Sequence, residues 1–155
     1  MRILFILIAS LAFAETCIFS PPSGWEKAPA PPADILIGYL GKGSTQFRPS
    51  ITLASEEVEL SLKDYAKAVK QIHLEDPNIK LRDLGKFNVV GGEGRLMEIT
   101  SFCPCGEVKM LQALFVQGSK AYILTAAVLK KDFAEHQAEL LKSLRSMTVT
   151  TENSP

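Results

Sequence analysis

The chain has 155 residues, 46% of them hydrophobic, and its 17 basic side chains balance its 17 acidic ones. The two signs are interspersed, without the basic stripe that displaces counterions from a nucleic acid. The composition therefore argues against a nucleic-acid partner, and the length fits one folded domain.

The first fourteen residues have the pattern of a cleavable secretory signal peptide. Arg2 precedes an apolar segment, and Ala12-Phe13-Ala14 places small residues at the −3 and −1 positions before Glu15. The alternative is an uncleaved anchor, but a membrane-spanning helix needs about 20 apolar residues. A lipid anchor on Cys17 would require a small residue before it, where the chain has Thr16. We predict cleavage after Ala14, no membrane span in the mature chain, and a periplasmic or secreted location.

The segment that follows is predicted to be extended. Residues 17–20 form a short extended stretch, and five of the nine prolines lie in 21–32. Prolines remove backbone donors, so 21–32 is interpreted as an extended crossing over the domain surface. Apolar residues predict strands at 35–40 and 50–54, separated by a glycine-rich turn.

A helix is predicted from Ser61 to just before Pro77. Ser61 can cap the amide of Asp64, whose carboxylate can reach back as in a capping box. The apolar residues that follow recur at helical spacing and predict one buried stripe: Leu62, Tyr65, Ala66, Val69 and Ile72.

Residues 87–90 open the second half, in which three strands are predicted at 95–102, 108–116 and 121–128. Gly118-Ser119 is typical of a two-residue hairpin turn whose glycine takes a positive φ. The last of the three strands is almost entirely apolar. We therefore predict that it lies centrally in the sheet and is covered on both faces.

A second helix is predicted over 132–145, followed by an edge strand at 147–149. Asp132 stands at the first position of a capping box. The apolar residues of this helix share one face: Phe133, Leu140, Leu141 and Leu144. Residues 150–155 are predicted to be a disordered tail, which leaves 15–149 as the domain. The order of elements predicts an α+β fold in which two α-helices flank an antiparallel β-sheet.

Several of these elements together resemble the PsbP/DcrB-like family. They are Pro22-Ser23-Gly24-Trp25, the strand Tyr122-Ile123-Leu124-Thr125-Ala126, a helix bearing Phe133, and Ser146-Met147 at the start of the edge strand. The resemblance extends over residues 18–149 and implies a PsbP-like antiparallel sheet with helices on its faces. It also implies a binding or accessory role rather than catalysis. Bacterial relatives are typically cell-envelope proteins, often lipid-anchored, and this chain departs from them because it lacks a lipobox.

Three cysteines, Cys17, Cys103 and Cys105, follow the predicted leader. An odd number allows at most one pair within the chain. The ordinary interpretation is a structural bridge from Cys17 to one of the other two, and a second is three unpaired thiols. A third is a disulfide between Cys103 and Cys105 at a hairpin tip, which would make the protein an envelope thiol/disulfide-active protein.

The sequence contains no catalytic or metal-binding motif. The potential zinc ligands, which are the three cysteines with His73 and His136, lack the paired spacing of a zinc site. Ser44 is interpreted as a turn serine, and the glycines at 41–43 and 91–94 lack the spacing of nucleotide-binding loops. We therefore predict no enzymatic activity, no cofactor and no metal.

Trp25 is the one tryptophan of the chain. The ordinary interpretation is a ring packed over the end of the sheet. If exposed, it would form a contact patch with Tyr39 or Phe47. Export, the lack of catalytic motifs and the resemblance together predict a binding or accessory module of the cell envelope. Such a module would hold a protein partner on a sheet face or a loop surface.

Overall fold

The computed structural model describes residues 13–43 and 46–153. Within this part, the chain forms nine strands and two α-helices. In chain order these are β1 (Phe13–Ile18), β2 (Glu26–Lys27), β3 (Ile35–Leu40), β4 (Ser50–Glu57), α1 (Leu62–Leu74), β5 (Lys80–Val89), β6 (Gly92–Cys103), β7 (Gly106–Gln117), β8 (Lys120–Leu129), α2 (Phe133–Arg145) and β9 (Thr148–Asn153). None of the described helices is long and apolar enough to span a membrane.

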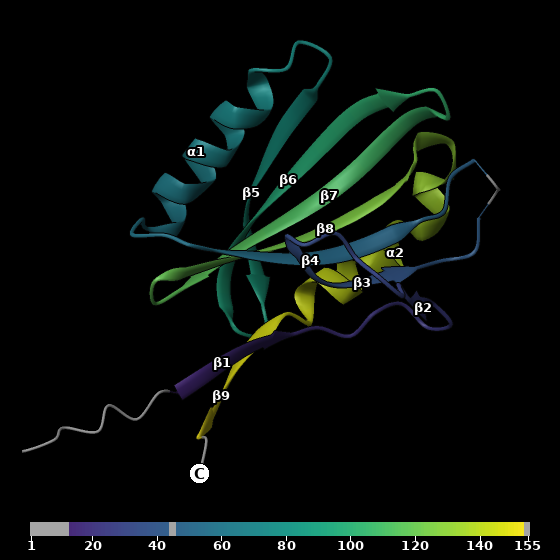
Figure 1. The fold of residues 1–155 in the computed structure, drawn as a ribbon. Helices are drawn as coiled ribbons and strands as arrows, with labels where there is room; N and C mark the ends of the chain where they lie inside the picture. Colours follow the sequence, from purple (N-terminus) through teal and green to yellow (C-terminus); the bar gives the residue numbers. More distant parts are fainter. Residues whose placement is uncertain (1–12, 44–45, 154–155) are drawn as a thin grey trace, which may run out of the picture.

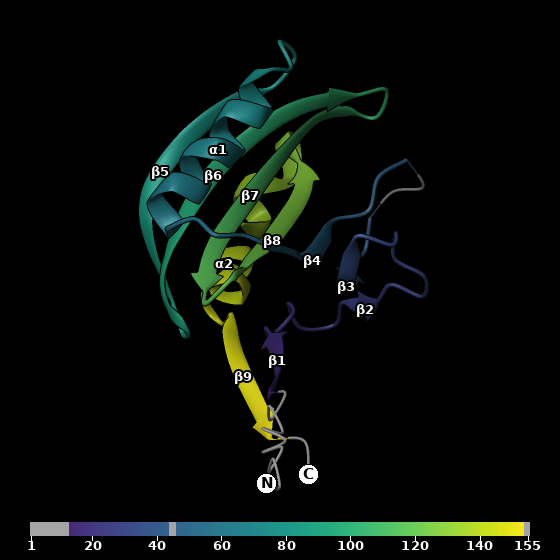
Figure 2. The same ribbon diagram turned by 60° about the vertical axis from the view of Figure 1, so that its left-hand side comes forward.

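In the described residues, seven strands form one sheet in the order β2-β3-β4-β8-β7-β6-β5, and all paired neighbours are antiparallel (Figure 1). The strand β8 lies fourth in this order, which confirms its predicted central position. Strands β1 and β9 form a separate antiparallel ribbon at one end of the molecule (Figures 1 and 2). The α+β class with an antiparallel sheet is therefore confirmed.

Local chemistry accounts for several element boundaries. Ser61 caps α1, because its Oγ accepts a hydrogen bond from the Asp64 amide at 3.1 Å. Gly118 has a φ of 59° in the turn between β7 and β8, as predicted. The capping box predicted at Asp132 is wrong, because a 3₁₀ turn over Lys130–Asp132 gives this residue helical backbone angles and its side chain caps none of the described amides.

Strand β5 (Lys80–Val89) is the main element that was not predicted, because only residues 87–90 were singled out in this part of the sequence. It is an edge strand that pairs only with β6 in the described sheet. Most of its side chains are exposed, and only Phe87 and Val89 are buried. A bulge between Asp83 and Gly85 further interrupts its register. An edge strand of this kind lacks the apolar alternation from which strands are recognised.

The two helices lie on opposite faces of the sheet (Figure 2). Alternate residues of β7 divide between two hydrophobic clusters, because successive side chains of a strand point to opposite sides. Leu111 and Phe115 pack with α2, whereas Leu114 packs with Tyr65 of α1. We call these sides the α2 face and the α1 face. The prediction that two helices flank the sheet therefore holds in outline.

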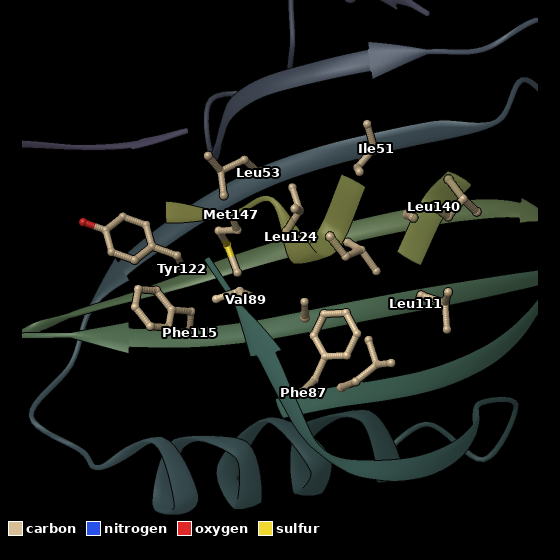
Figure 3. Close-up of a cluster of buried hydrophobic side chains, with 14 of the residues drawn as sticks. Ile51, Leu53, Phe87, Val89, Leu111, Phe115, Tyr122, Leu124, Leu140 and Met147 are labelled. Carbon is tan, nitrogen blue, oxygen red and sulfur yellow. The ribbon is translucent and has the colours of Figure 1, made fainter. Parts of the chain in front are cut away.

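The larger cluster lies on the α2 face (Figure 3). Leu140 and Leu144 of α2 and Met147 after it are completely buried against strand residues such as Ile51 and Leu124. Each such side chain contributes about 1.5–3 kcal/mol on burial, so this face is the main source of stability.

Strand β9 extends beyond the predicted end of the domain. Residues 150–153, which were expected in a disordered tail, pair with residues 13–16 of β1 and are therefore strand. The predicted cleavage junction between Ala14 and Glu15 lies within β1, and the rest of the predicted leader lies outside the described residues. Cleavage there would leave the pairing of Glu15–Ile18 with Thr148–Thr151.

Candidate partner-binding surface

Helix α1 covers only part of its face of the sheet. It packs against β5, β6 and β7, and Figure 2 shows β8 and β4 beyond its edge. In β8, Leu124 and Ala126 are buried under α2, whereas Ile123 and Thr125 on the other side are only half-buried. The prediction that β8 is covered on both faces is therefore wrong for the α1 face. An all-apolar strand does not reveal this difference.

We call the uncovered part of the α1 face the open face. It comprises seven uncharged α1-side residues of β4, β7 and β8: Thr52, Ala54, Met110, Gln112, Ile123, Thr125 and Ala127. All seven are half-buried. Two of them, Met110 and Ile123, also pack at its border against the α1-face cluster, and the exposed Glu56 lies on the same side at the end of β4. The register places Thr52, Thr125 and Gln112 side by side in one row across the three strands.

A chain of hydrogen bonds holds the polar row in place. The Nε2 group of Gln112 donates to Thr125 Oγ1 at 3.1 Å, and Gln112 Oε1 accepts from His73 Nε2 at 3.2 Å. His73 belongs to the last turn of α1. Both ends of the Gln112 amide are therefore occupied, which fixes its orientation. This contact accounts for His73 without a metal.

The border of the open face on the α1 side includes an exposed isoleucine. The side chain of Ile72 is 65% exposed, although the helical stripe predicted that it would be buried. His73, the next residue, takes the position that faces the sheet. Ile72 lies seven residues after Tyr65 and so projects from nearly the same side of the helix. The Tyr65 hydroxyl donates to Glu56 of β4, so this side of α1 faces β4 and the open face.

The Tyr65 hydroxyl at this border has a raised pKa. Burial raises the pKa of Tyr65 above its ordinary value, and the Glu56 carboxylate that accepts its hydroxyl hydrogen raises the pKa further. Tyr65 therefore remains a protonated donor at neutral pH. Its hydroxyl joins α1 to β4 across the end of the open face.

Three solved structures share this arrangement of strands and helices. LpqN from Mycobacterium tuberculosis, described as involved in cell envelope biogenesis, superposes with a TM-score of 0.68 at 12% identity, over 89% of this chain and 85% of LpqN. The cyanobacterial PsbP (CyanoP) of Synechocystis sp. PCC 6803 superposes with a TM-score of 0.60 at 8% identity, over 92% of this chain and 95% of CyanoP. The chain has a PsbP-like fold.

A third similar structure is the Ran-binding protein Mog1p of Saccharomyces cerevisiae, with a TM-score of 0.50 at 17% identity, over 88% of this chain and 87% of Mog1p. No protein-family model matches the sequence, and no curated protein matches it. The PsbP-like fold predicted from the sequence is thus confirmed by structure, at identities that establish the fold alone.

In this PsbP-like domain, Cys103 and Cys105 form a disulfide, with their Cα atoms 5.1 Å apart, and Cys17 is unpaired among the described residues. The structure therefore does not place Cys17 beside either cysteine with which a bridge was expected. Cys17 lies beside Tyr122 near the start of β8, whereas the Cys103–Cys105 hairpin lies beside Leu129 at its end. These two β8 positions are roughly 23 Å apart, and a disulfide needs Cα atoms within about 7 Å.

The three aromatic residues predicted as a contact patch are all half-buried. Trp25 and Tyr39 pack against the cluster on the α2 face. The Trp25 ring also contacts His136 edge to face, with ring centroids 6.4 Å apart. Phe47 lines a small cavity that also borders His136. The contact role predicted for these aromatic residues stays a prediction.

His136 is also held by contacts within the PsbP-like domain, because its Nδ1 lies 2.7 Å from Glu139 Oε1. Among the described residues, no three His, Cys, Asp or Glu side chains are placed to hold a metal ion. Neither histidine singled out in the sequence therefore belongs to such a group of three within the described part of the chain.

The open face itself was not identified from the sequence. Its residues are threonine, alanine, glutamine and single apolar residues, which are ordinary in strands. The available signal was in β7, where Gln112 interrupts the apolar α1-side positions Met110 and Leu114. A polar residue at one such position is typical of a surface that is not fully covered.

Proposed function

We propose that this protein is a non-catalytic accessory module, exported to the bacterial cell envelope, that holds a partner protein on its open face. The observation that carries the proposal is the difference between the two sides of β8. Leu124 is 0% exposed under α2, whereas its neighbours Ile123 and Thr125, on the other side, are only half-buried and uncharged. Uncharged, partly apolar surface of this kind favours a protein contact.

The width of the open face fits one helix of the partner. From β7 to β4 there are two strand spacings of about 4.8 Å, which give about 10 Å between the outer strands of the open face. An α-helix with its side chains is about 10–12 Å wide. The small residues Ala54 and Ala127 allow a helix to approach closely, and Ile72 offers an apolar contact from the α1 side. We therefore propose that the partner contributes an amphipathic helix that lies beside α1.

Two further observations support the proposal. The sequence has the pattern of a secretory leader, and proteins of this fold include LpqN, described as involved in cell envelope biogenesis, and the Ran-binding protein Mog1p. Neither LpqN nor Mog1p identifies the partner of this protein.

Site-specific photo-cross-linking in the intact envelope tests the proposal. A photoreactive side chain at position 125 is expected to cross-link one defined protein, whereas the same side chain at the exposed Lys142 on α2 is expected to give none. The cross-linked peptide of the partner is expected to come from an amphipathic helix. Cross-links of the same protein from position 142 but not from 125 would contradict the proposal.

A further inference from the structure

The Cys103–Cys105 disulfide closes a loop in which only Pro104 lies between the cysteines. The chain entropy that a disulfide removes increases with loop length, so this bridge constrains the unfolded chain much less than a long-range one would. The same turn is already closed by the pairing of Cys103 with Gly106 at the end of β6 and β7. Stabilisation of the fold is therefore a weak reason for this disulfide.

The disulfide lies where another molecule can reach it. Pro104 and Gly106 are exposed at the tip of the hairpin, and the neighbouring Phe102 side chain is 56% exposed. Two cavities, of about 370 and 460 Å³, are both lined by Cys105. Neither is lined by Cys103. Access from these cavities therefore leads to the Cys105 side of the bridge.

The two sulfur atoms also differ electronically. The Cys105 amide donates a hydrogen bond to Cys103 Sγ at 3.2 Å, and such a donor stabilises a thiolate on Cys103. On the other side, Lys130 and Lys131 line the same cavity as Cys105. Lys130 is neutralised by Glu107, with its Nζ 3.1 Å from Glu107 Oε1. Lys131 has no ion pair within the described residues and so leaves net positive charge, which attracts an incoming thiolate.

We propose that this hairpin tip is a thiol–disulfide exchange site in which Cys105 is attacked and Cys103 is the leaving group. The thiolate of a substrate forms a bond to Cys105 Sγ. The bond between the two cysteines breaks, and its electron pair stays on Cys103 Sγ, which then takes a proton from water. A second thiolate of the substrate attacks the substrate sulfur in the mixed disulfide and releases Cys105. The substrate dithiol is oxidised by two electrons, and the cysteine pair is reduced.

This inference is independent of the proposed partner contact, because the open face and the hairpin tip use different residues. The substrate class is a thiol, and two probes separate its possible sources. Reduced glutathione represents a small thiol, and a reduced peptide with two cysteines represents a protein dithiol. A reaction with either probe supports the site, and the faster one identifies the source.

The test uses the oxidised full-length mature protein, mixed with one equivalent of glutathione, quenched with acid and mapped by mass spectrometry. The mixed disulfide is expected on Cys105 at least tenfold more often than on Cys103. Lys131→Glu is expected to slow the reaction severalfold, whereas Cys17→Ser is expected to leave the rate unchanged. Trp25 fluorescence checks that both variants are folded.

Three results would overturn the proposal. They are equal labelling of Cys103 and Cys105, no reaction of either probe with the folded protein, and recovery of Cys17 cross-linked to the hairpin in protein purified without reductant. The last result would also show that the pairing described above is not the one formed in the cell envelope.

Discussion

Replacing Leu124 with alanine and, separately, Thr125 with alanine compares two neighbours on β8 that point to opposite faces. Leu124 is 0% exposed, and the register places it between Leu53 and Ala113 beneath α2. Ala113 is too small to fill the space left by the lost side chain. We therefore expect Leu124→Ala to lower the free energy of unfolding by about 3–4 kcal/mol, within the range for buried leucines.

Thr125→Ala is expected to cost much less. Its hydroxyl accepts one hydrogen bond from Gln112 on a half-buried surface, where water can replace it. We expect a loss of about 0.5–1 kcal/mol, which is the net contribution of a typical hydrogen bond. The difference between the two variants therefore measures how differently the two faces are covered.

Urea unfolding followed by the fluorescence of Trp25 measures both variants, because this ring packs against the α2-face cluster. For a domain of this size, 1 kcal/mol corresponds to about 3–5 °C in Tm. Leu124→Ala is therefore expected to lower Tm by roughly 9–20 °C, and Thr125→Ala by no more than about 5 °C. Equal losses from the two variants would refute the assignment of Thr125 to an uncovered face.

Three further predictions each concern one site in the chain. A Cβ on Gly41 would lie 2.8 Å from Trp25 Cε2, so Gly41→Ala is expected to displace the ring, shift its emission to longer wavelength and cost about 1–2 kcal/mol; an unchanged spectrum would contradict this packing. Burial raises the pKa of Cys17 from 9.0 to about 11. The protonated thiol therefore dominates at pH 8, and alkylation by iodoacetamide is expected to be about 100-fold slower than in urea-unfolded chain; equal rates, compared by mass spectrometry, would refute this. The intact mass of the protein recovered from the envelope is expected to correspond to a chain that begins at Glu15, and a chain that retains Met1 would contradict the predicted cleavage.

Elements could be predicted from the sequence where neighbouring residues determine them. The bounds of β3 match the prediction, because turn residues flank a short apolar run. The cap on Ser61 and the positive φ of Gly118 are likewise local effects of a hydroxyl and of a missing side chain. These features do not depend on what the element later packs against.

The remaining features depend on contacts between distant residues. The sequence of β8 is apolar on both sides, so it could not show that α2 covers one face and that α1 stops short on the other. For the same reason, Ile72 fits the helical stripe but lies beyond the covered part of the sheet. Which cysteines can pair depends on their positions along β8: Cys17 lies near its start and Cys105 near its end. The order of the cysteines in the sequence does not reveal these positions.

The most direct test of the account measures the affinity of the cross-linked partner for two charge variants, Thr125→Lys on the open face and Lys142→Glu on α2. A lysine buried in a partner contact without a counter-charge is costly, and we expect Thr125→Lys to raise Kd by about 100-fold, or about 2.7 kcal/mol. Lys142→Glu is expected to leave Kd unchanged, and fluorescence of Trp25 checks that both variants are folded. Undiminished affinity of folded Thr125→Lys would contradict the claim that the partner binds the open face.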